Sequence, residues 1–266
     1  LSNYEVVPTH DVDMLKSYHR RYEPLRYACG DIIKRGQPFK GLRRLVAYLP
    51  IEPKRSFNRL MSLSEKYGVK SHFYFMAPSE HRMDSTYAIL YPALLRAMAL
   101  SVRERGHYVG YHPGYNTFDN MDEWERQKTS LEKILSMVLK EGRQHVLRYA
   151  VDCTPRIWNN CGMKTDYTLA FPEKPGFRTG STRCFSAYDL IERKVLNIDL
   201  CATSVMDFSL FGGKYQDLSI NEAIEECKPI ISACRRYSGR LVILQHTGST
   251  SIRVNKFYNR LLKEAA

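Results

Sequence analysis

The chain has 266 residues, of which 44% are hydrophobic and 26% are charged, a composition typical of a soluble globular protein with a sizeable core. It contains no apolar run long enough to span a bilayer and no basic-then-apolar signal peptide at the N-terminus. The formal net charge of +12 indicates an anionic partner, which can be a nucleic acid, an anionic glycan or an anionic membrane face.

The first predicted element is a strand that ends in Thr9-His10-Asp11-Val12-Asp13. Because side chains alternate between the two faces of a strand, Asp11 and Asp13 lie on the same face. Two carboxylates that share a site can bind a cation, or one can stay beside a metal ion while the other moves protons. A strand followed by an acidic helix cap explains these residues equally well, so the choice depends on the rest of the chain.

Helices and strands then alternate along the chain, with boundaries predicted from hydrophobic periodicity and from the positions of Gly and Pro. The predicted helices cover residues 14–35 (with a break near Pro24), 56–67, 92–105, 122–141, 220–237 and 252–264. The further predicted strands cover residues 42–49, 69–76, 107–111, 145–149 and 240–245. The connections are long enough for parallel pairing, so we expect an α/β fold with a parallel sheet covered by helices.

The pattern is irregular between residues 153 and 217, which hides the number of strands there. Since the sequence has no repeat, low-complexity segment or linker, we expect one domain over residues 1–266. The seven cysteines form no CxxC pair, and their odd number argues against a closed disulfide framework. We expect reduced thiols in a cytoplasmic protein that is also able to associate with a membrane.

Polar residues recur where the predicted strands finish. Asp11 and Asp13 end the first strand, and His112, Arg148 and His246 lie at or near the ends of three later strands. In a parallel barrel or an open parallel sheet, the loops after the strands meet over one edge, and functional residues collect there. We therefore expect these acidic, imidazole and guanidinium groups to share one site.

Each of these residues also has a purely structural explanation. His112 can belong to a turn with Pro113 and Gly114, and His246 can mark a simple change from strand to loop. The other histidines, His145 among them, have no evident partner in the sequence, and we assign them to structure. Arg148 lies among apolar neighbours, where an unpaired guanidinium would be costly, so we expect it to have an acidic partner.

Taken together, these segments resemble the NodB-homology polysaccharide deacetylases, carbohydrate esterase family 4, in the family's motif order. Residues 9–13 resemble the family's opening Thr-Phe-Asp-Asp motif, and residues 67–75 are similar to its second-strand signature. Residues 106–112 resemble its Gly-His-Glu-Ile-Gly-Asn-His segment. Arg148 is placed like the arginine of the third motif, and Leu244-Gln245-His246 resembles the late Leu-x-His motif.

The resemblance implies a distorted barrel of the (β/α)7 type and metal-assisted removal of N-acetyl groups from a sugar. It makes Asp11 the base, with Arg148 holding its carboxylate in the ionised form, and His246 the acid that protonates the leaving amine. It makes Asp13 and His112 metal ligands. The expected metal is Zn²⁺, with Co²⁺, Ni²⁺ or Mn²⁺ as alternatives.

Two departures from the family pattern bear on the metal and on the base. The second metal-binding His of the family corresponds to Asn116 here, and Val12 separates the two carboxylates, which leaves open which of them is the base. Asn is a weaker zinc ligand than imidazole, so we expect low metal affinity with Asn116 as the third ligand. Both departures, and a Gly-Phe-Arg-x-Gly segment at residues 176–180, resemble a subgroup of deacetylases associated with bacterial O-antigen and capsule gene clusters.

The expected substrate is an N-acetylated glycan or a lipid-linked sugar, with Arg178, Tyr115 and Trp158 as candidate sugar-binding residues. An anionic membrane face is a second expected partner. The alternative function is that of a catalytically weak or inactive deacetylase-like protein that binds an acidic glycan. A third hypothesis, based on charge alone, is a nucleic-acid-binding protein or a phosphodiesterase. We expect no nucleic-acid partner, because the sequence has no recognisable motif for one.

Overall fold

The computed structural model of the chain describes residues 3–15, 23–39, 41–42, 51–248 and 251–266. The strands within these ranges are β1 (Glu5–Val12), β2 (His72–Met76), β3 (Tyr108–His112), β4 (Glu141–Gly142), β5 (Thr165–Asp166), β6 (Phe185–Asp189), β7 (Lys194–Leu200), β8 (Val205–Met206) and β9 (Arg240–Leu244). The helices are α1 (Glu23–Cys29), α3 (Ile51–Lys66), α4 (Tyr87–Leu90), α5 (Pro92–Glu104), α6 (Met121–Leu135), α7 (Thr154–Asn160), α8 (Asp207–Phe211), α9 (Ile220–Arg236) and α10 (Ile252–Ala265). A π-helical segment η1 (Gly30–Lys34) and a 3-10 turn η2 (His145–Leu147) complete them.

The strands form one sheet in the order β6-β7-β5-β4-β3-β2-β1-β9-β8, and all neighbours run parallel except β6 and β7. This confirms the predicted α/β fold with a mostly parallel sheet. The sheet is open, because within the described residues no ladder joins β6 or β7 to β8. Residues 201–204 link β7 to β8. They form single hydrogen bonds to the neighbouring strands, from Cys201 N to Asp166 O of β5 and from Ser204 N to Val242 O of β9.

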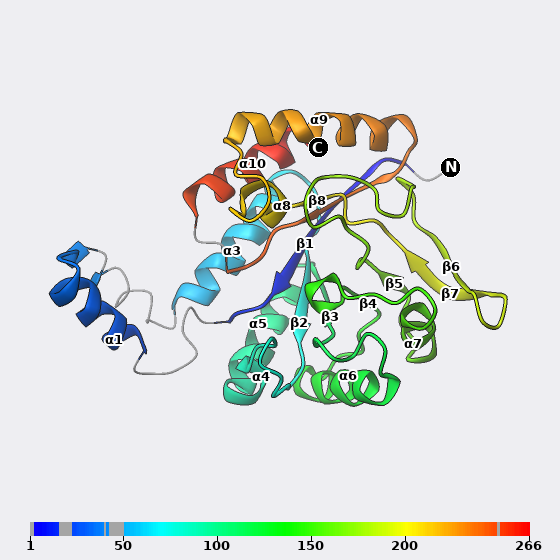
Figure 1. Cartoon of the computed structure of the whole chain (residues 1–266), viewed down its shortest axis with the longest axis horizontal. Helices are drawn as coiled ribbons and strands as arrows, with labels where there is room; N and C mark the ends of the chain where they lie inside the picture. Colours follow the sequence, from blue (N-terminus) through cyan, green and yellow to red (C-terminus); the bar gives the residue numbers. More distant parts are fainter. Residues whose placement is uncertain (1–2, 16–22, 40, 43–50, 249–250) are drawn as a thin grey trace.

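The central strand β1 is buried along all but its first residue, as expected for a parallel strand covered on both faces. In Figure 1, α9 and α10 lie on one side of the strands and α4, α5 and α6 lie on the other. The helix starts follow the sequence: Asn120 caps α6, and Ser219 forms a capping box with Glu222 at α9. In the part of the chain that the structure describes, no helix is both long enough and apolar enough to cross a bilayer.

Two predictions around residue 140 are wrong, namely the end of the long helix and the strand over residues 145–149. The long helix ends at Leu135, because Ser136 adopts a left-handed conformation with φ 53°. Residues 145–147 form the turn η2, where a strand over 145–149 was predicted. The short strand β4 precedes this turn and lies so close to β3 that a Cβ on Gly142 would be 1.9 Å from the carbonyl oxygen of Tyr111. Glycine therefore marks a close strand approach here, where its presence had suggested the end of a helix.

The first predicted helix and the second predicted strand fall partly or wholly outside the described residues. Of the helix predicted over 14–35, the structure describes α1 and η1 but not residues 16–22. Of the strand predicted over 42–49, it describes only residue 42.

The prediction of seven reduced thiols is wrong for two of them. Cys184 and Cys201 form a disulfide, with their Cα atoms 4.4 Å apart. The antiparallel pairing of β6 with β7 sets Phe185 opposite Leu200, so the next residue outward on each strand also faces its counterpart. An odd number of cysteines excludes a fully paired framework but leaves room for one bridge.

The register of the sheet brings several strand ends to one edge. Met76 of β2 pairs with His112 of β3, and Tyr111 of β3 pairs with Gly142 of β4. On the other side of β1, Thr9 pairs with Leu244 of β9. The residues that follow β1, β4 and β9, together with His112, therefore lie over the same edge.

Candidate functional site

Asp13, His112 and His145 lie together at the carboxyl ends of β1, β3 and β4. One potential ligand atom from each of the three lies within 4.8 Å of the others. His112 Nε2 is 3.4 Å from Asp13 Oδ1, and the imidazole rings of His112 and His145 are 5.1 Å apart. One carboxylate and two imidazoles form a donor set that suits zinc and other borderline divalent cations.

Both histidines of this cluster are held by a hydrogen bond at the ring nitrogen Nδ1. His112 Nδ1 donates to the carbonyl oxygen of Arg143 at 2.5 Å, which leaves Nε2 facing the cluster. His145 Nδ1 lies 2.7 Å from Asp84 Oδ1, and Asp84 is itself held by Ser79 Oγ. Such hydrogen bonds fix the ring orientation and the tautomer of metal-binding histidines.

The Asp13 carboxylate fits a cation as well. Its Oδ1 atom is buried, and its 3.4 Å contact with His112 Nε2 lacks the geometry of a hydrogen bond. A buried carboxylate oxygen without a partner is costly in a folded protein, and a bound cation would remove that cost. The two oriented imidazoles and this oxygen therefore fit a divalent metal ion.

The charges in the cluster are strongly coupled. Burial raises the pKa of Asp13, but the neighbouring His112 and His246 outweigh it and hold this pKa well below its usual range. Burial lowers the pKa of His112, yet Asp11 and Asp13 outweigh it and raise this pKa above its usual value. The cluster thus favours an ionised carboxylate beside positive charge, which protons or a metal ion can supply.

Asp11 lies beside this cluster in a buried ion pair with Arg143. Arg143 is fully buried, and its Nη1 donates to Asp11 Oδ1 at 2.7 Å. Three further hydrogen bonds run from the guanidinium to Thr9 Oγ1, Thr203 Oγ1 and the carbonyl oxygen of Tyr167. Asp11 Oδ2 lies 4.0 Å from His112 Nε2. One oxygen of Asp11 is therefore fixed by the arginine, while the other faces the cluster.

His246, which follows β9, lies beside Asp13 of the same cluster. Its Nδ1 lies 2.7 Å from Asp207 Oδ1, its backbone N–H donates to Asp207 Oδ2, and its Nε2 is 3.8 Å from Asp13 Oδ2. Burial lowers the pKa of His246, but the Asp207 carboxylate outweighs it and raises this pKa to about 9. At neutral pH the ring is therefore an imidazolium that can donate a proton from Nε2.

A small cavity of about 210 Å³ opens beside Asp13 and His246. Most of its lining is apolar and comes from Met14, Phe208, Phe211 and Val254. The ring of Phe208 also contacts the His246 imidazole edge-on, with centroids 4.6 Å apart. An apolar cavity next to ionisable groups is typical of a site that binds a small organic group and acts on it.

Of the residues predicted from the sequence, Asp11, Asp13, His112 and His246 lie together at this site. The pairing of Arg148 with an acidic residue is wrong, because Arg143 contacts Asp11 instead. Arg148 donates to the carbonyl oxygen of Tyr115 at 2.8 Å and stacks on the rings of Tyr115 and Phe118. The error follows from the misplaced strand: the arginine that reaches β1 comes directly after the two residues of β4.

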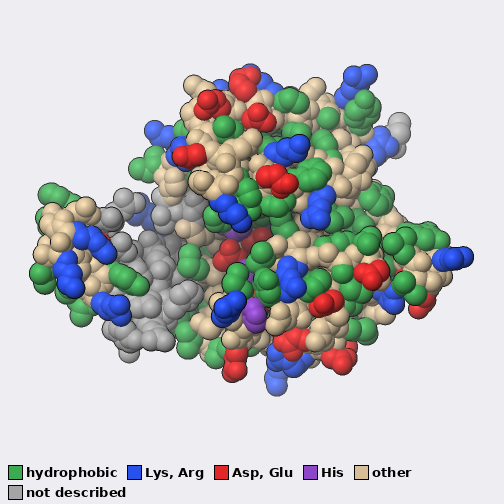
Figure 2. Space-filling view, in the orientation of Figure 1, with side chains coloured by type: hydrophobic (Ala, Val, Ile, Leu, Met, Phe, Trp, Pro, Cys, Tyr) green, Lys and Arg blue, Asp and Glu red, His purple; other side chains and the backbone are tan. Residues whose placement is uncertain are grey.

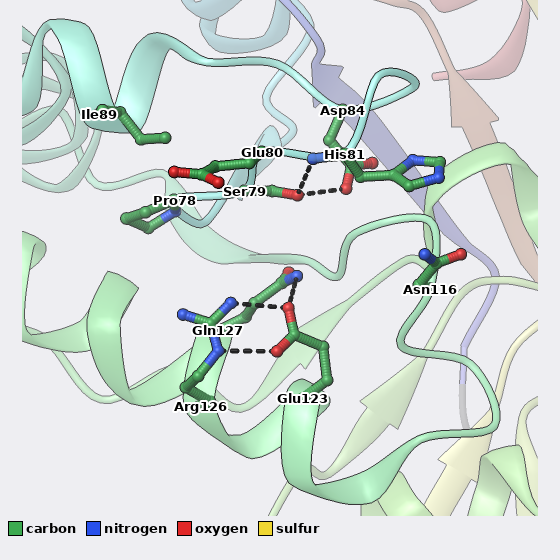
Figure 3. A pocket seen from close by; sticks show the side chains of 10 residues that line it. All are labelled: Pro78, Ser79, Glu80, His81, Asp84, Ile89, Asn116, Glu123, Arg126 and Gln127. Atoms are coloured by element: carbon green, nitrogen blue, oxygen red, sulfur yellow. Dashed lines mark hydrogen bonds and ion pairs between the residues drawn. The ribbon is translucent and has the colours of Figure 1, made fainter.

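Asn116, the predicted third metal ligand, lines a different cavity from the one beside Asp13 and His246. It is exposed and lines a separate cavity of about 560 Å³ between the loops that follow β2 and β3, shown in Figure 3. Glu80, His81 and Arg126 also line this cavity. His145, which had been assigned to structure, is the third residue of the cluster.

The three candidate sugar-binding residues lie in different surroundings. Trp158 is fully buried against Trp124, with ring centroids 5.5 Å apart, so its assignment to a sugar site is wrong. Arg178 is exposed on the loop after β5 and donates to the carbonyl oxygen of Ala170. Tyr115 is half-buried and stacks on His81, with centroids 4.9 Å apart. Its backbone N–H donates to Asp84 Oδ1, which places Tyr115 near the His145 side of the cluster.

Four residues of the site were missed: Arg143, His145, Asp84 and Asp207. Three of them follow strands of only two residues, β4 and β8, which are too short to show a periodic pattern. Asp207 nevertheless carried a signal, because it follows the apolar pair Val205-Met206 as an acidic residue at a strand end. Asp13 was identified as an acidic residue at the end of an apolar strand. The same rule would have identified Asp207 if the surrounding sequence pattern had been regular.

No known protein family matches the sequence, and no curated protein sequence matches it. Among solved structures, the chain is similar to a candidate polysaccharide deacetylase from Mycobacterium smegmatis, with 19% identity and a TM-score of 0.58 over 99% of this chain and 84% of the other. It is also similar to a candidate polysaccharide deacetylase involved in O-antigen biosynthesis from Bordetella bronchiseptica, with 13% identity and a TM-score of 0.48 over 100% and 92% of the two chains. A family 4 carbohydrate esterase from Streptomyces lividans shows 12% identity and a TM-score of 0.47 over 99% and 88%. The Mycobacterium smegmatis match shows the fold that the sequence motifs predicted.

Proposed function

We propose that this chain, which has the fold of a polysaccharide deacetylase, is a metal-dependent hydrolase that removes an N-acetyl group from a sugar. One observation carries the proposal: two groups suited to proton transfer lie within about 4 Å of residues of the metal-binding cluster. Asp11, fixed by Arg143, has Oδ2 4.0 Å from His112 Nε2, and the His246 imidazolium has Nε2 3.8 Å from Asp13 Oδ2. Hydrolysis of an amide needs an activated water and a proton for the departing amine.

Asp13, His112 and His145 would hold the metal ion, and Zn²⁺ suits this set of one oxygen and two nitrogen donors best. When bound, the ion would polarise the acyl carbonyl and lower the pKa of a water molecule. This assignment replaces Asn116 with His145 as the third ligand. It also removes the reason to expect weak metal binding, because imidazole is a stronger zinc ligand than an amide oxygen.

Asp11 is the proposed base. Arg143 engages Oδ1, so Oδ2 is the oxygen available to take a proton from the attacking water. The guanidinium, held by three further hydrogen bonds, keeps this carboxylate in one orientation. A fixed orientation lowers the cost of reaching the reactive geometry.

His246 is the proposed acid. As the C–N bond of the amide breaks, the proton on Nε2 passes to the sugar nitrogen, and the water oxygen ends in the released acetate. Asp207 stabilises the imidazolium and fixes its ring, so that Nε2 points toward Asp13. The adjacent cavity, with Phe208 and Phe211 in its wall, accommodates the methyl side of the acyl group.

The proposed substrate is an N-acetylated sugar in a bacterial surface polysaccharide or in its lipid-linked precursor. The net charge of +12 supports a polyanionic glycan or an anionic lipid carrier. Both proton-transfer groups and all three metal ligands are present, which favours an active enzyme over a protein that only binds a glycan.

The test is the release of acetate from a panel of N-acetylated amino-sugar oligosaccharides by the zinc-loaded protein. Asp11→Asn should abolish acetate release while circular dichroism shows an unchanged fold. Asp119→Asn, a matched change of an exposed aspartate, should leave the activity intact. Full activity in Asp11→Asn would refute the proposal.

A further inference from the structure

The cavity beside Asp13 and His246 is larger than an acetyl group requires. Its volume is about 210 Å³, whereas an acetyl group would place a single methyl in it. An apolar protein cavity of about 150 Å³ is already large enough to hold benzene, which has six carbon atoms. The cavity beside the candidate site therefore has room for an acyl chain of about six carbon atoms.

Apolar side chains from three separate elements form the walls of this cavity. Met14 follows β1, Phe208 and Phe211 belong to α8, and Val254 belongs to α10. The Phe211 ring is supported edge-on by Phe257, with centroids 4.9 Å apart. In Figure 2 this face of the molecule is hollowed near its middle, close to α8 and the end of β1 in Figure 1, and hydrophobic and acidic side chains meet there. The walls therefore suit an apolar group.

The polar end of the cavity offers little to a sugar ring. Asp207 is already engaged, because Oδ1 lies 2.7 Å from His246 Nδ1 and accepts from the Phe208 amide, while Oδ2 accepts from the His246 amide. Asp13 and His246 have roles in the proposed hydrolysis, and no other described residue of the lining has a polar side chain. A sugar placed here would bury hydroxyl groups without partners, which is costly. The acyl side of the amide fits the cavity better.

We propose that the cavity binds the acyl chain of the substrate, and that the enzyme removes unbranched acyl groups of about four to six carbon atoms from a sugar nitrogen in preference to acetyl. This inference rests on the proposed function of the site. The reaction is the same hydrolysis: the C–N bond breaks, the water oxygen joins the acyl carbon, and His246 protonates the departing amine. The products are the free amino sugar and a carboxylate longer than acetate.

The first experiment compares glucosamine oligosaccharides that carry N-acetyl, N-butyryl or N-hexanoyl groups as substrates of the zinc-loaded protein. The release of free amine gives kcat/KM for each. The burial of each additional methylene should strengthen binding about fourfold, so kcat/KM for the N-butyryl substrate should exceed that for the N-acetyl substrate about tenfold or more.

A second measurement needs no sugar and no turnover. Aceto-, butyro- and hexanohydroxamic acid bind a metal ion through the same head group, so they differ only in the alkyl chain that lies beside the ion. Calorimetry with the zinc-loaded protein should show an affinity that rises about fourfold with each methylene group until the cavity is filled.

A variant of the cavity wall tests the location of the chain. Met14→Gln keeps the length of the side chain but places an amide in the wall, and Met14 is 37% exposed, so the variant should fold. The ratio of kcat/KM for the N-hexanoyl substrate to that for the N-acetyl substrate should fall about fivefold or more. The matched control Met121→Gln changes a methionine that is 41% exposed at the start of α6, and it should keep the ratio of the unaltered protein.

Equal kcat/KM for the three substrates, or equal affinity for the three hydroxamic acids, would overturn this inference alone, because release of acetate would still support the proposed hydrolysis. An equal ratio in Met14→Gln and Met121→Gln would overturn the assignment of the acyl chain to this cavity. Circular dichroism of both variants checks that they fold. No free amine from any of the three substrates would instead refute the proposed function, and this inference with it.

Discussion

Replacing Arg143 with methionine should strongly destabilise the protein. Arg143 is fully buried, and its partner Asp11 is only 3% exposed. Methionine keeps much of the length of the side chain but removes every hydrogen-bond donor. Asp11 would then remain as a buried carboxylate without its counter-ion.

The free energy of unfolding should fall by about 3–5 kcal/mol, which is typical when one partner of a buried ion pair is removed. This is a large share of the total stability of an ordinary domain, about 5–15 kcal/mol. At about 2–4 °C for each kcal/mol in a chain of this size, Tm should fall by about 10 °C.

The assay is urea and thermal unfolding of four proteins: unaltered, Arg143→Met, Arg143→Met/Asp11→Asn and Arg148→Met. The double variant Arg143→Met/Asp11→Asn also removes the buried charge of Asp11, so it should recover about 1–3 kcal/mol of the lost stability. Arg148→Met removes an arginine that stacks on Tyr115 and Phe118 and is only partly buried, so it should cost about 1 kcal/mol. A loss below about 1 kcal/mol for Arg143→Met, or no recovery in the double variant, would refute the reasoning.

Two further predictions concern the groups around the cluster. Asp84→Asn should weaken zinc binding about tenfold or more, measured by calorimetry against Asp119→Asn, because it removes the charge that orients His145; equal affinity in the two variants would contradict this role. The folded pKa of His246 is raised from 6.5 to about 9, so the stabilisation from Asp207 is fully present below pH 6.5 and is lost as the pH rises through 9. The free energy of unfolding of the metal-free protein in urea should therefore fall by about 3 kcal/mol over that range, and Asp207→Asn should remove most of this loss, the rest being due to Asp13 and Asp11. The same pH dependence in both proteins would show that another group titrates.

The sequence was sufficient to predict the regular half of the molecule. The strands β1, β2, β3 and β9 are long enough for apolar runs to be visible, and they pair in parallel as their long connections require. The residues at the ends of β1, β3 and β9 could be named for the same reason. A strand end in a parallel sheet is a place defined by backbone geometry, so the chemistry that follows it can be read along the chain.

The remaining site residues could not be predicted because their positions depend on contacts between distant elements. The strand β4 exists because Gly142 allows close approach to Tyr111, and this approach places Arg143 and His145 at the site. Nothing local distinguishes His145 from the other histidines until Asp84, on the loop after β2, is found at its Nδ1 atom. Trp158 illustrates the opposite error, because it was assigned to the sugar site but belongs to the core. An aromatic residue near a site is often part of the core.

The central claim is that Asp13, His112 and His145 bind one metal ion, and zinc titration by calorimetry tests it most directly. The protein should bind one equivalent of zinc, His145→Ala should lose most of that affinity, and Asn116→Ala should bind like the unaltered protein. Loss of zinc binding in Asn116→Ala together with its retention in His145→Ala would contradict the claim.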